Sequence, residues 1–263
     1  MQILTREDTM RMLNKVPEVT LYFWIIKIMA TTVGETAADF LNFNLNFGLT
    51  GTSIVMSVLL VIFLVVQLRA RRYIPWIYWL AVVLISVVGT LITDNLVDNF
   101  GVPLETTTIV FGLALLVTFV AWYASERTLS IHTIFTTKRE LFYWVAILFT
   151  FALGTAAGDL AAETLNLGYA NSTLMFGALI SIVAFAYYGF KANAVLAFWI
   201  AYILTRPLGA SFGDYLSQSV TDGGLGLGTV ATSALFLSTI AGLVIYLSIT
   251  RRDLLEQPTD QTI

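Results

Sequence analysis

The sequence contains no cysteine and only one histidine, His132. Without cysteine there are no disulfides, no thiolate metal site and no thiol catalysis. Haem ligation and histidine-rich zinc sites are poorly supported, because His132 lies in a polar segment. Charge is also scarce, since Asp, Glu, Lys and Arg make up 12% of the 263 residues, against about 25% in a soluble domain. The composition therefore argues against an ordinary soluble protein.

Apolar residues are abundant and arranged in long runs. They make up 57% of the chain, and the mean hydropathy is +0.81. Runs of about 20 apolar residues have the length that crosses a hydrocarbon core of roughly 30 Å. The run 53–66 does not alternate as the strands of a membrane barrel do. We predict an all-α integral membrane protein, with no cleavable signal peptide because residues 1–19 are polar.

The apolar runs predict eight transmembrane helices in a single domain over residues 20–250. The helices are expected at about 20–42, 51–68, 74–97, 105–124, 140–163, 171–190, 193–217 and 228–249. They form four two-helix repeats, at about 20–68, 74–124, 140–190 and 193–249. Because each repeat contains an even number of spans, the repeats should be parallel. We expect each to pack as a helical hairpin around a pseudo-symmetric centre.

Basic residues predict that both termini are cytoplasmic. Of the 14 Lys and Arg residues, only Lys27 and Arg206 fall inside predicted helices. All the others lie before the first helix, after the last, or in the loops on the same side. The opposite loops, around 43–50, 98–104, 164–170 and 218–227, contain none. By the positive-inside rule, residues 1–19 and 251–263 form a cytoplasmic segment and tail.

Each repeat carries the same motif, an aromatic-Trp pair followed at fixed spacing by Gly and then Asp. The copies are Phe23-Trp24 with Gly34 and Asp39, Tyr78-Trp79 with Gly89 and Asp94, Tyr143-Trp144 with Gly154 and Asp159, and Phe198-Trp199 with Gly209 and Asp214. The longer step between the second and third copies suggests that a two-repeat unit was duplicated. We interpret the tryptophans as an interfacial aromatic belt and the glycines as sites of close helix packing.

The motif aspartates lie in predicted membrane spans, where an ionisable residue is a functional candidate by default. Three of the helices add a second acid four residues away, on the same helix face. The candidate metal- or proton-binding acids are Glu35, Asp39, Asp94, Asp98, Asp159, Glu163 and Asp214. Two internal cations cannot neutralise seven carboxylates, which favours a bound cation or protons. The candidate supporting oxygen ligands are Thr32, Thr90, Asn95 and Thr155, and such donors suit hard cations.

Lys27 and Arg206 are candidate counter-ions or gating residues. Lys27 lies near the start of its helix, and we favour a side chain that snorkels to the cytoplasmic headgroups. Arg206 lies deeper and precedes Pro207, which should kink the helix. We expect Arg206 to pair with a carboxylate and to release it when cargo binds.

The fourfold motif, with phrases such as Thr31-Thr32-Val33-Gly34-Glu35 and Gly154-Thr155-Ala156-Ala157-Gly158-Asp159, resembles a family of bacterial membrane proteins. That family is built from four copies of a repeat of unknown function and is catalogued as uncharacterised membrane-anchored proteins. The resemblance covers about residues 15–250. It implies a multi-pass protein of the bacterial inner membrane and a link to divalent metals, especially manganese. Ala210 departs from the acid or threonine that follows the motif glycine elsewhere, so the site should be asymmetric.

These patterns favour a transporter that exports a hard divalent cation or exchanges it for protons. Manganese is the favoured cargo, with magnesium and calcium as alternatives. Transport of an organic cation, a polyamine or a proton-coupled small molecule stays open, as does a channel. An intramembrane enzyme is disfavoured, because there is no Tyr-Asp pair and no membrane histidine. A retinal receptor is excluded, because no late helix carries lysine.

We therefore expect no catalytic residue and no required cofactor. The expected partners are the lipid bilayer and a cation substrate, and not nucleic acid.

Overall fold

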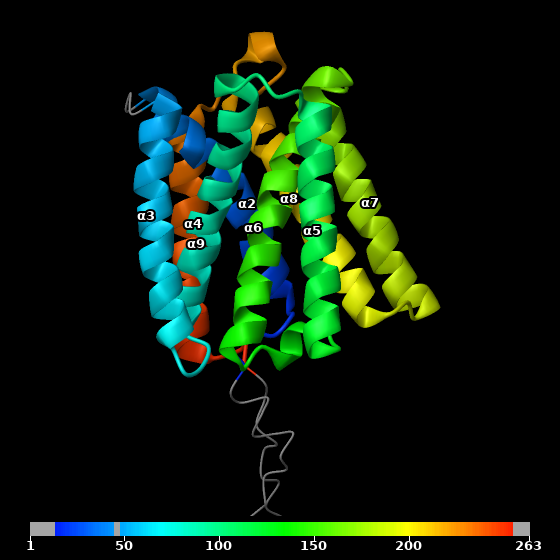
Figure 1. The fold of residues 1–263 in the computed structure, drawn as a ribbon. Coiled ribbons are helices and arrows are strands. Elements are labelled where there is room, and N and C mark those ends of the chain that lie inside the picture. The colour runs from blue at the N-terminus through cyan, green and yellow to red at the C-terminus, as the bar shows by residue number, and fades with distance from the viewer. Residues whose placement is uncertain (1–13, 45–47, 255–263) are drawn as a thin grey trace, which may run out of the picture.

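The computed structural model describes residues 14–44 and 48–254 (Figure 1). This part of the chain contains eight long helices: α2 (Leu21–Asp39), α3 (Gly48–Arg69), α4 (Pro75–Asp94), α5 (Leu104–Glu126), α6 (Thr137–Asp159), α7 (Gly168–Phe190), α8 (Ala194–Ser217) and α9 (Thr229–Thr250). Each coincides with one predicted span, so the all-helical prediction is confirmed. Residues 1–13 and 255–263 of the predicted cytoplasmic ends, and 45–47 of the first outer loop, lie outside the described residues.

Seven of the described helices are long and apolar enough to cross a membrane. The eighth long helix, α2, contains three ionisable residues, Lys27, Glu35 and Asp39. The α8 helix continues through Pro207 as far as Ser217. The chain is thus a multi-pass helical membrane protein, and α2, with its three ionisable residues, packs against α4, α8 and α9.

The helices form two concentric layers. The inner ring is closed, because α2 packs against α4 and α8, and α6 also packs against α4 and α8. Outside it, α3 packs on α4, α5 on α6, α7 on α8, and α9 on α2. The predicted hairpins are therefore wrong as packing units, since each outer helix covers the inner helix of the next repeat. This interlocking buries the polar inner helices and leaves the uniformly apolar outer helices to face lipid.

The motif glycines lie where neighbouring inner helices touch. If a motif glycine carried a Cβ atom, that atom would collide with a residue of the next inner helix around the ring. The residue it meets always lies three positions before the motif glycine of that helix. The four contacts join Gly34 to Ser86, Gly89 to Phe151, Gly154 to Arg206, and Gly209 to Thr31. Small residues allow such close approach of helices. Because the same register recurs at every contact, the inner ring has pseudo-fourfold symmetry.

The motif tryptophans do not form the predicted interfacial belt. Trp79, Trp144 and Trp199 are buried, and only Trp24 is partly exposed. The reason is that outer helices and connectors cover the starts of the inner helices. The indole of Trp199, for example, donates to the Leu129 carbonyl at 2.9 Å. Trp79, Trp144 and Trp199 are therefore core residues of the bundle.

Residues 14–18 cross one end of the bundle without regular secondary structure, and the chain bends at Lys15 and Val16. Lys15 Nζ lies 2.7 Å from the buried Glu140 carboxylate, which also accepts a hydrogen bond from Gln67 Nε2 at 3.1 Å. The Glu18 amide donates to the Asp253 carbonyl at 3.1 Å. The segments that precede α2 and α6 and the segment that follows α9 therefore meet at one end. The motif aspartates lie toward the other ends of their helices.

Candidate cation site

Three inner helices change their winding at the motif aspartate. The α2, α4 and α6 helices end at Asp39, Asp94 and Asp159, and each continues directly as a π-helix. These π segments are η1 (Phe40–Asn44), η2 (Asn95–Asn99) and η4 (Leu160–Thr164). Such π turns within helices are frequently found at functional sites. The fourth repeat differs, because α8 remains α-helical through Asp214 to Ser217.

Arg206 lies fully buried at the centre of the inner ring. Its Nη1 donates to the Thr31 carbonyl at 2.9 Å. Its Nη2 donates to Glu35 Oε2 at 3.0 Å and to Thr155 Oγ1 at 2.6 Å. The same nitrogen also contacts the Thr90 hydroxyl. These five residues are the Arg206 cluster.

The Arg206 cluster follows the pseudo-symmetry of the ring. Glu35, Thr90 and Thr155 each come directly after the motif glycine, in α2, α4 and α6. The guanidinium from the fourth repeat therefore contacts equivalent positions in the other three. In α8 the equivalent residue is Ala210, one turn beyond Arg206, and its small side chain leaves room for the guanidinium. The fourth repeat thus differs from the other three, as predicted, and the difference lies where it supplies Arg206 to the cluster.

Three carboxylates converge beside this arginine. The oxygens of Glu35, Asp159 and Asp214, from α2, α6 and α8, all lie within 4.8 Å of one another. Glu35 and Asp214 are buried, and Asp159 is partly buried. Oxygens on opposite sides of one Ca²⁺ are about 4.6–5.2 Å apart, since Ca–O distances are about 2.3–2.6 Å. This carboxylate cluster can therefore share a single hard cation.

The other predicted acids surround the carboxylate cluster at increasing exposure. Asp39 and Asp94 are partly buried, and Gln218 Nε2 lies 3.5 Å from Asp39 Oδ2. Asp98 and Glu163 are exposed at the rim. In the pairs Asp94/Asp98 and Asp159/Glu163, the motif aspartate is therefore the more buried acid, and the second acid is exposed. Because Glu35 interacts electrostatically with all four motif aspartates, the acids form one continuous region rich in carboxyl groups.

The four predicted oxygen ligands fall into two groups, those that contact Arg206 and those that do not. Thr90 and Thr155 belong to the Arg206 cluster. Thr32 is buried but donates to the Ile28 carbonyl of its own helix at 3.2 Å. Asn95 donates to Ser53 Oγ at 2.8 Å and to the Leu91 carbonyl at 2.7 Å. Two of the four candidates therefore lie beside the arginine, and the other two make hydrogen bonds elsewhere.

Lys27 does not snorkel to the headgroups, so that interpretation is wrong. Its side chain is fully buried, because α2 belongs to the inner ring and directs the lysine into the bundle. The Nζ atom lies 4.2 Å from the centre of the Phe151 ring and 4.3 Å from that of Tyr202. It has no hydrogen-bond acceptor among the described residues.

Replacing Lys27 with methionine is expected to raise the thermal stability of the purified protein or leave it unchanged. Methionine keeps the apolar stem against Phe151 and Tyr202 and removes an amine that lacks a hydrogen-bond partner. Burying such a polar group costs about 1–3 kcal/mol, and loss of the cation–π contacts offsets about 0.5–2 kcal/mol of the gain. The measurement is the unfolding temperature in one detergent. A large fall in that temperature would contradict this view of Lys27.

Sequence reasoning missed an aromatic layer next to Arg206. The hydroxyl groups of Tyr78 and Tyr143 are 2.5 Å apart, and both residues, like Tyr202, are fully buried. The Arg206 guanidinium lies 5.5 Å from the centre of the Phe151 ring. A usable signal existed, because Tyr78 and Tyr143 occupy the first position of the repeated motif. This layer lies between the charged centre and the end of the bundle that residues 14–18 cross.

The interlocked helices and their buried charged centre define a multi-pass membrane protein with a fourfold internal repeat. The chain belongs to the family described as Repeat of Unknown Function (DUF347), which matches it four times, at residues 22–73, 77–128, 142–193 and 197–253. These matches confirm the predicted resemblance to a four-copy repeat family. Among curated proteins and among solved structures, none matches the chain.

Proposed function

We propose that the chain is a membrane transporter of a hard divalent cation, acting as an exporter or a proton-coupled exchanger. The observation that carries this proposal is the convergence of Glu35, Asp159 and Asp214 within a helical membrane bundle. Ionisable residues inside membranes are costly and mark ion pathways. An all-oxygen donor set suits manganese, magnesium or calcium rather than softer metals. The preference for manganese rests on the family resemblance.

Arg206 gives this proposal a gating element. In the structure its guanidinium neutralises Glu35, one of the three clustered acids. A divalent cation bound among those acids repels the guanidinium and competes for Glu35. Since Arg206 also holds Thr31, Thr90 and Thr155, its release loosens contacts among all four inner helices. Cargo binding is thereby coupled to rearrangement of the ring, as a two-state transporter requires.

Under this proposal the four repeats run in the same direction through the bacterial inner membrane. The basic loops and both termini face the cytoplasm, in keeping with the positive-inside rule. The acidic region then lies toward the outside. Transport of this kind needs neither a catalytic residue nor a resident cofactor.

The proposal is tested by the metal content of cells that express the protein. Wild type and an Asp159→Asn/Asp214→Asn variant are expressed at equal membrane levels under mild manganese, magnesium, calcium and iron loads. Elemental mass spectrometry should show a change in one metal, manganese first, with wild type only. With purified protein, each asparagine should weaken binding of that metal at least tenfold, since loss of outer-shell partners alone costs about 10–100-fold.

The matched control is Glu105→Gln, which removes an exposed carboxylate from the first turn of α5 and should behave as wild type. The proposal fails if no metal responds to the wild-type protein. It also fails if the double variant changes metal content as wild type does.

A further inference from the structure

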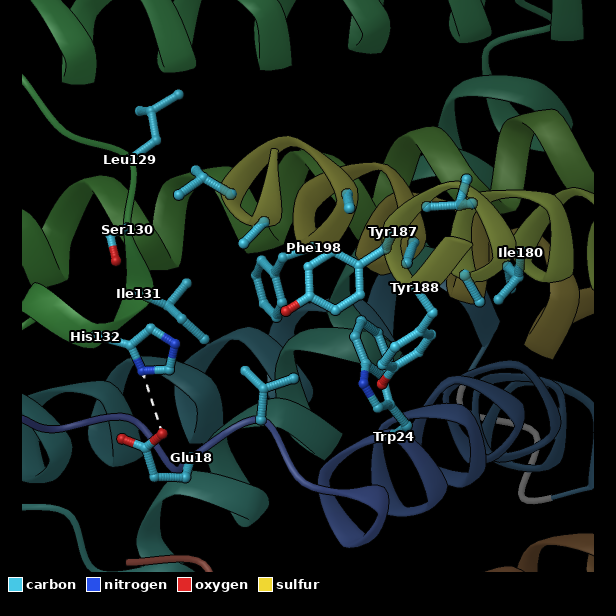
Figure 2. A pocket seen from close by; sticks show the side chains of 17 residues that line it. Glu18, Trp24, Leu129, Ser130, Ile131, His132, Ile180, Tyr187, Tyr188 and Phe198 are labelled. Atoms are coloured by element: carbon cyan, nitrogen blue, oxygen red, sulfur yellow. Dashed lines mark ion pairs between the residues drawn. The ribbon is translucent and has the colours of Figure 1, made fainter. Parts of the chain in front are cut away.

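A second feature lies at the end of the bundle where residues 14–18 cross. It is a cavity of about 490 Å³ between the start of α2, the second half of α7 and the start of α8. Figure 2 shows the side chains of Trp24, Tyr187, Tyr188 and Phe198 gathered on one side of it. Glu18 and His132 lie at its other side. The cavity shares no residue with the Arg206 cluster or the carboxylate cluster.

Comparison of the repeats explains why this cavity exists. In the second repeat, the Phe119 ring packs edge-on against Trp199, with ring centres 4.9 Å apart. When the repeats that begin at residues 77 and 142 are aligned, Ala184 occupies the position of Phe119. Ala184 lines the cavity, which Trp24 also lines. The methyl group of Ala184 thus lies where a phenyl ring lies in the second repeat. As a result Trp24 is partly exposed, whereas Trp199, which packs against Phe119, is buried.

The lining has the chemistry that recognises an organic cation. The Glu18 carboxylate is partly exposed and lies 3.3 Å from Nδ1 of His132. Among the described residues that line the cavity, none is Lys or Arg. The faces of aromatic rings attract cations and repel anions. A volume of 490 Å³ falls in the range of about 300–1,000 Å³ that holds drug-sized ligands.

We propose that this cavity binds a lipophilic organic cation. The charge of the ligand lies between Glu18 and the aromatic faces, and its apolar body fills the space beside Ala184. An anionic headgroup is disfavoured here, because it meets a carboxylate without a lysine or arginine among the lining residues. This site is separate from the divalent-cation site and does not depend on it.

The test uses two probe ions of the same shape and opposite charge, tetraphenylphosphonium and tetraphenylborate. Their saturable binding is measured by equilibrium dialysis with the purified full-length protein in a non-ionic maltoside detergent, which carries no ammonium group. Tetraphenylphosphonium should bind saturably, and tetraphenylborate should not. Glu18→Gln should weaken tetraphenylphosphonium binding about 2–5-fold, the range that loss of one partly exposed charge supplies.

Ala184→Phe is the decisive variant, because it restores the ring that the second repeat already accommodates. It should abolish saturable binding while leaving the unfolding temperature close to that of wild type. Ala234→Phe, on an exposed position of α9, is the matched control and should bind as wild type.

Three outcomes would overturn the proposal. They are equal binding of the two ions, wild-type affinity in Ala184→Phe, and wild-type affinity in Glu18→Gln. A fourth contrary result is loss of binding when phosphatidylcholine or phosphatidylethanolamine is added to the detergent, because a lipid ammonium group would then be the true occupant.

Discussion

Replacing Arg206 with methionine is expected to lower the unfolding temperature of the purified protein by about 6–20 °C. The change leaves Glu35 buried without its partner, and breaking one side of a buried ion pair costs about 3–5 kcal/mol. For a domain of this size each kcal/mol corresponds to about 2–4 °C. The same substitution removes the donors that hold Thr31, Thr90 and Thr155, so the transport that we propose should also be altered.

A double-mutant cycle separates the ion pair from general damage. Glu35→Gln alone should also destabilise, because it leaves the guanidinium buried without a carboxylate. The double variant Arg206→Met/Glu35→Gln should lose clearly less than the sum of the two single losses. Lys138→Met is the control, since it removes an exposed partner of Glu126 and should cost no more than about 1 kcal/mol. Additive losses in the cycle would show that the pair does not stabilise the ring.

Replacing Gly89 with alanine is expected to destabilise the protein by about 1–3 kcal/mol, the usual cost of overpacking a close contact. The added Cβ would lie 2.5 Å from the Cβ of Phe151 and 3.2 Å from the Ala152 amide nitrogen, so the helices α4 and α6 must move apart. The readout is the unfolding temperature, which should fall by about 2–12 °C on the scale of a domain this size.

Gly242 on α9 provides a matched control, because nothing lies within 4 Å of a Cβ added there. Gly242→Ala should leave stability unchanged or raise it by up to about 1 kcal/mol through helix propensity. If both substitutions shift the unfolding temperature equally, the motif glycines are not the contact points of the inner ring.

The positions of the helices could be predicted from the sequence because the bilayer fixes both their length and their composition. Runs such as 171–190 are apolar over a membrane thickness, and α7 follows that run closely. The sequence does not predict in the same way which helices pack against each other. The outer helices are apolar on every side, so no stripe of residues indicates whether α3 packs on α2 or on α4.

The carboxylate cluster was only partly predictable for a related reason. Fixed spacing named the acids, but their depth and direction depend on how each helix is rotated about its own axis. That rotation brings Glu35 to Arg206 across 171 positions in sequence and leaves Asp98 exposed. The predictions for the tryptophans and Lys27 are wrong because a position near a helix end is not always near lipid, and outer helices and connectors cover these positions. Aligning the motif copies would have placed Glu35, Thr90 and Thr155 in one register.

The closure of the outer layer by α9 on α2 bears on how such a chain evolved. If a two-repeat unit was duplicated, one unit by itself would leave α5 without the next inner helix and α2 without its cover. Two copies would complete each other, which makes the ancestor an obligate homodimer with a twofold axis through its centre. Any arginine on that axis would then occur twice, and two guanidinium groups would repel. Fusion of such a dimer into one chain would allow a single Arg206, and with it a centre in which one guanidinium pairs with one of the three clustered acids.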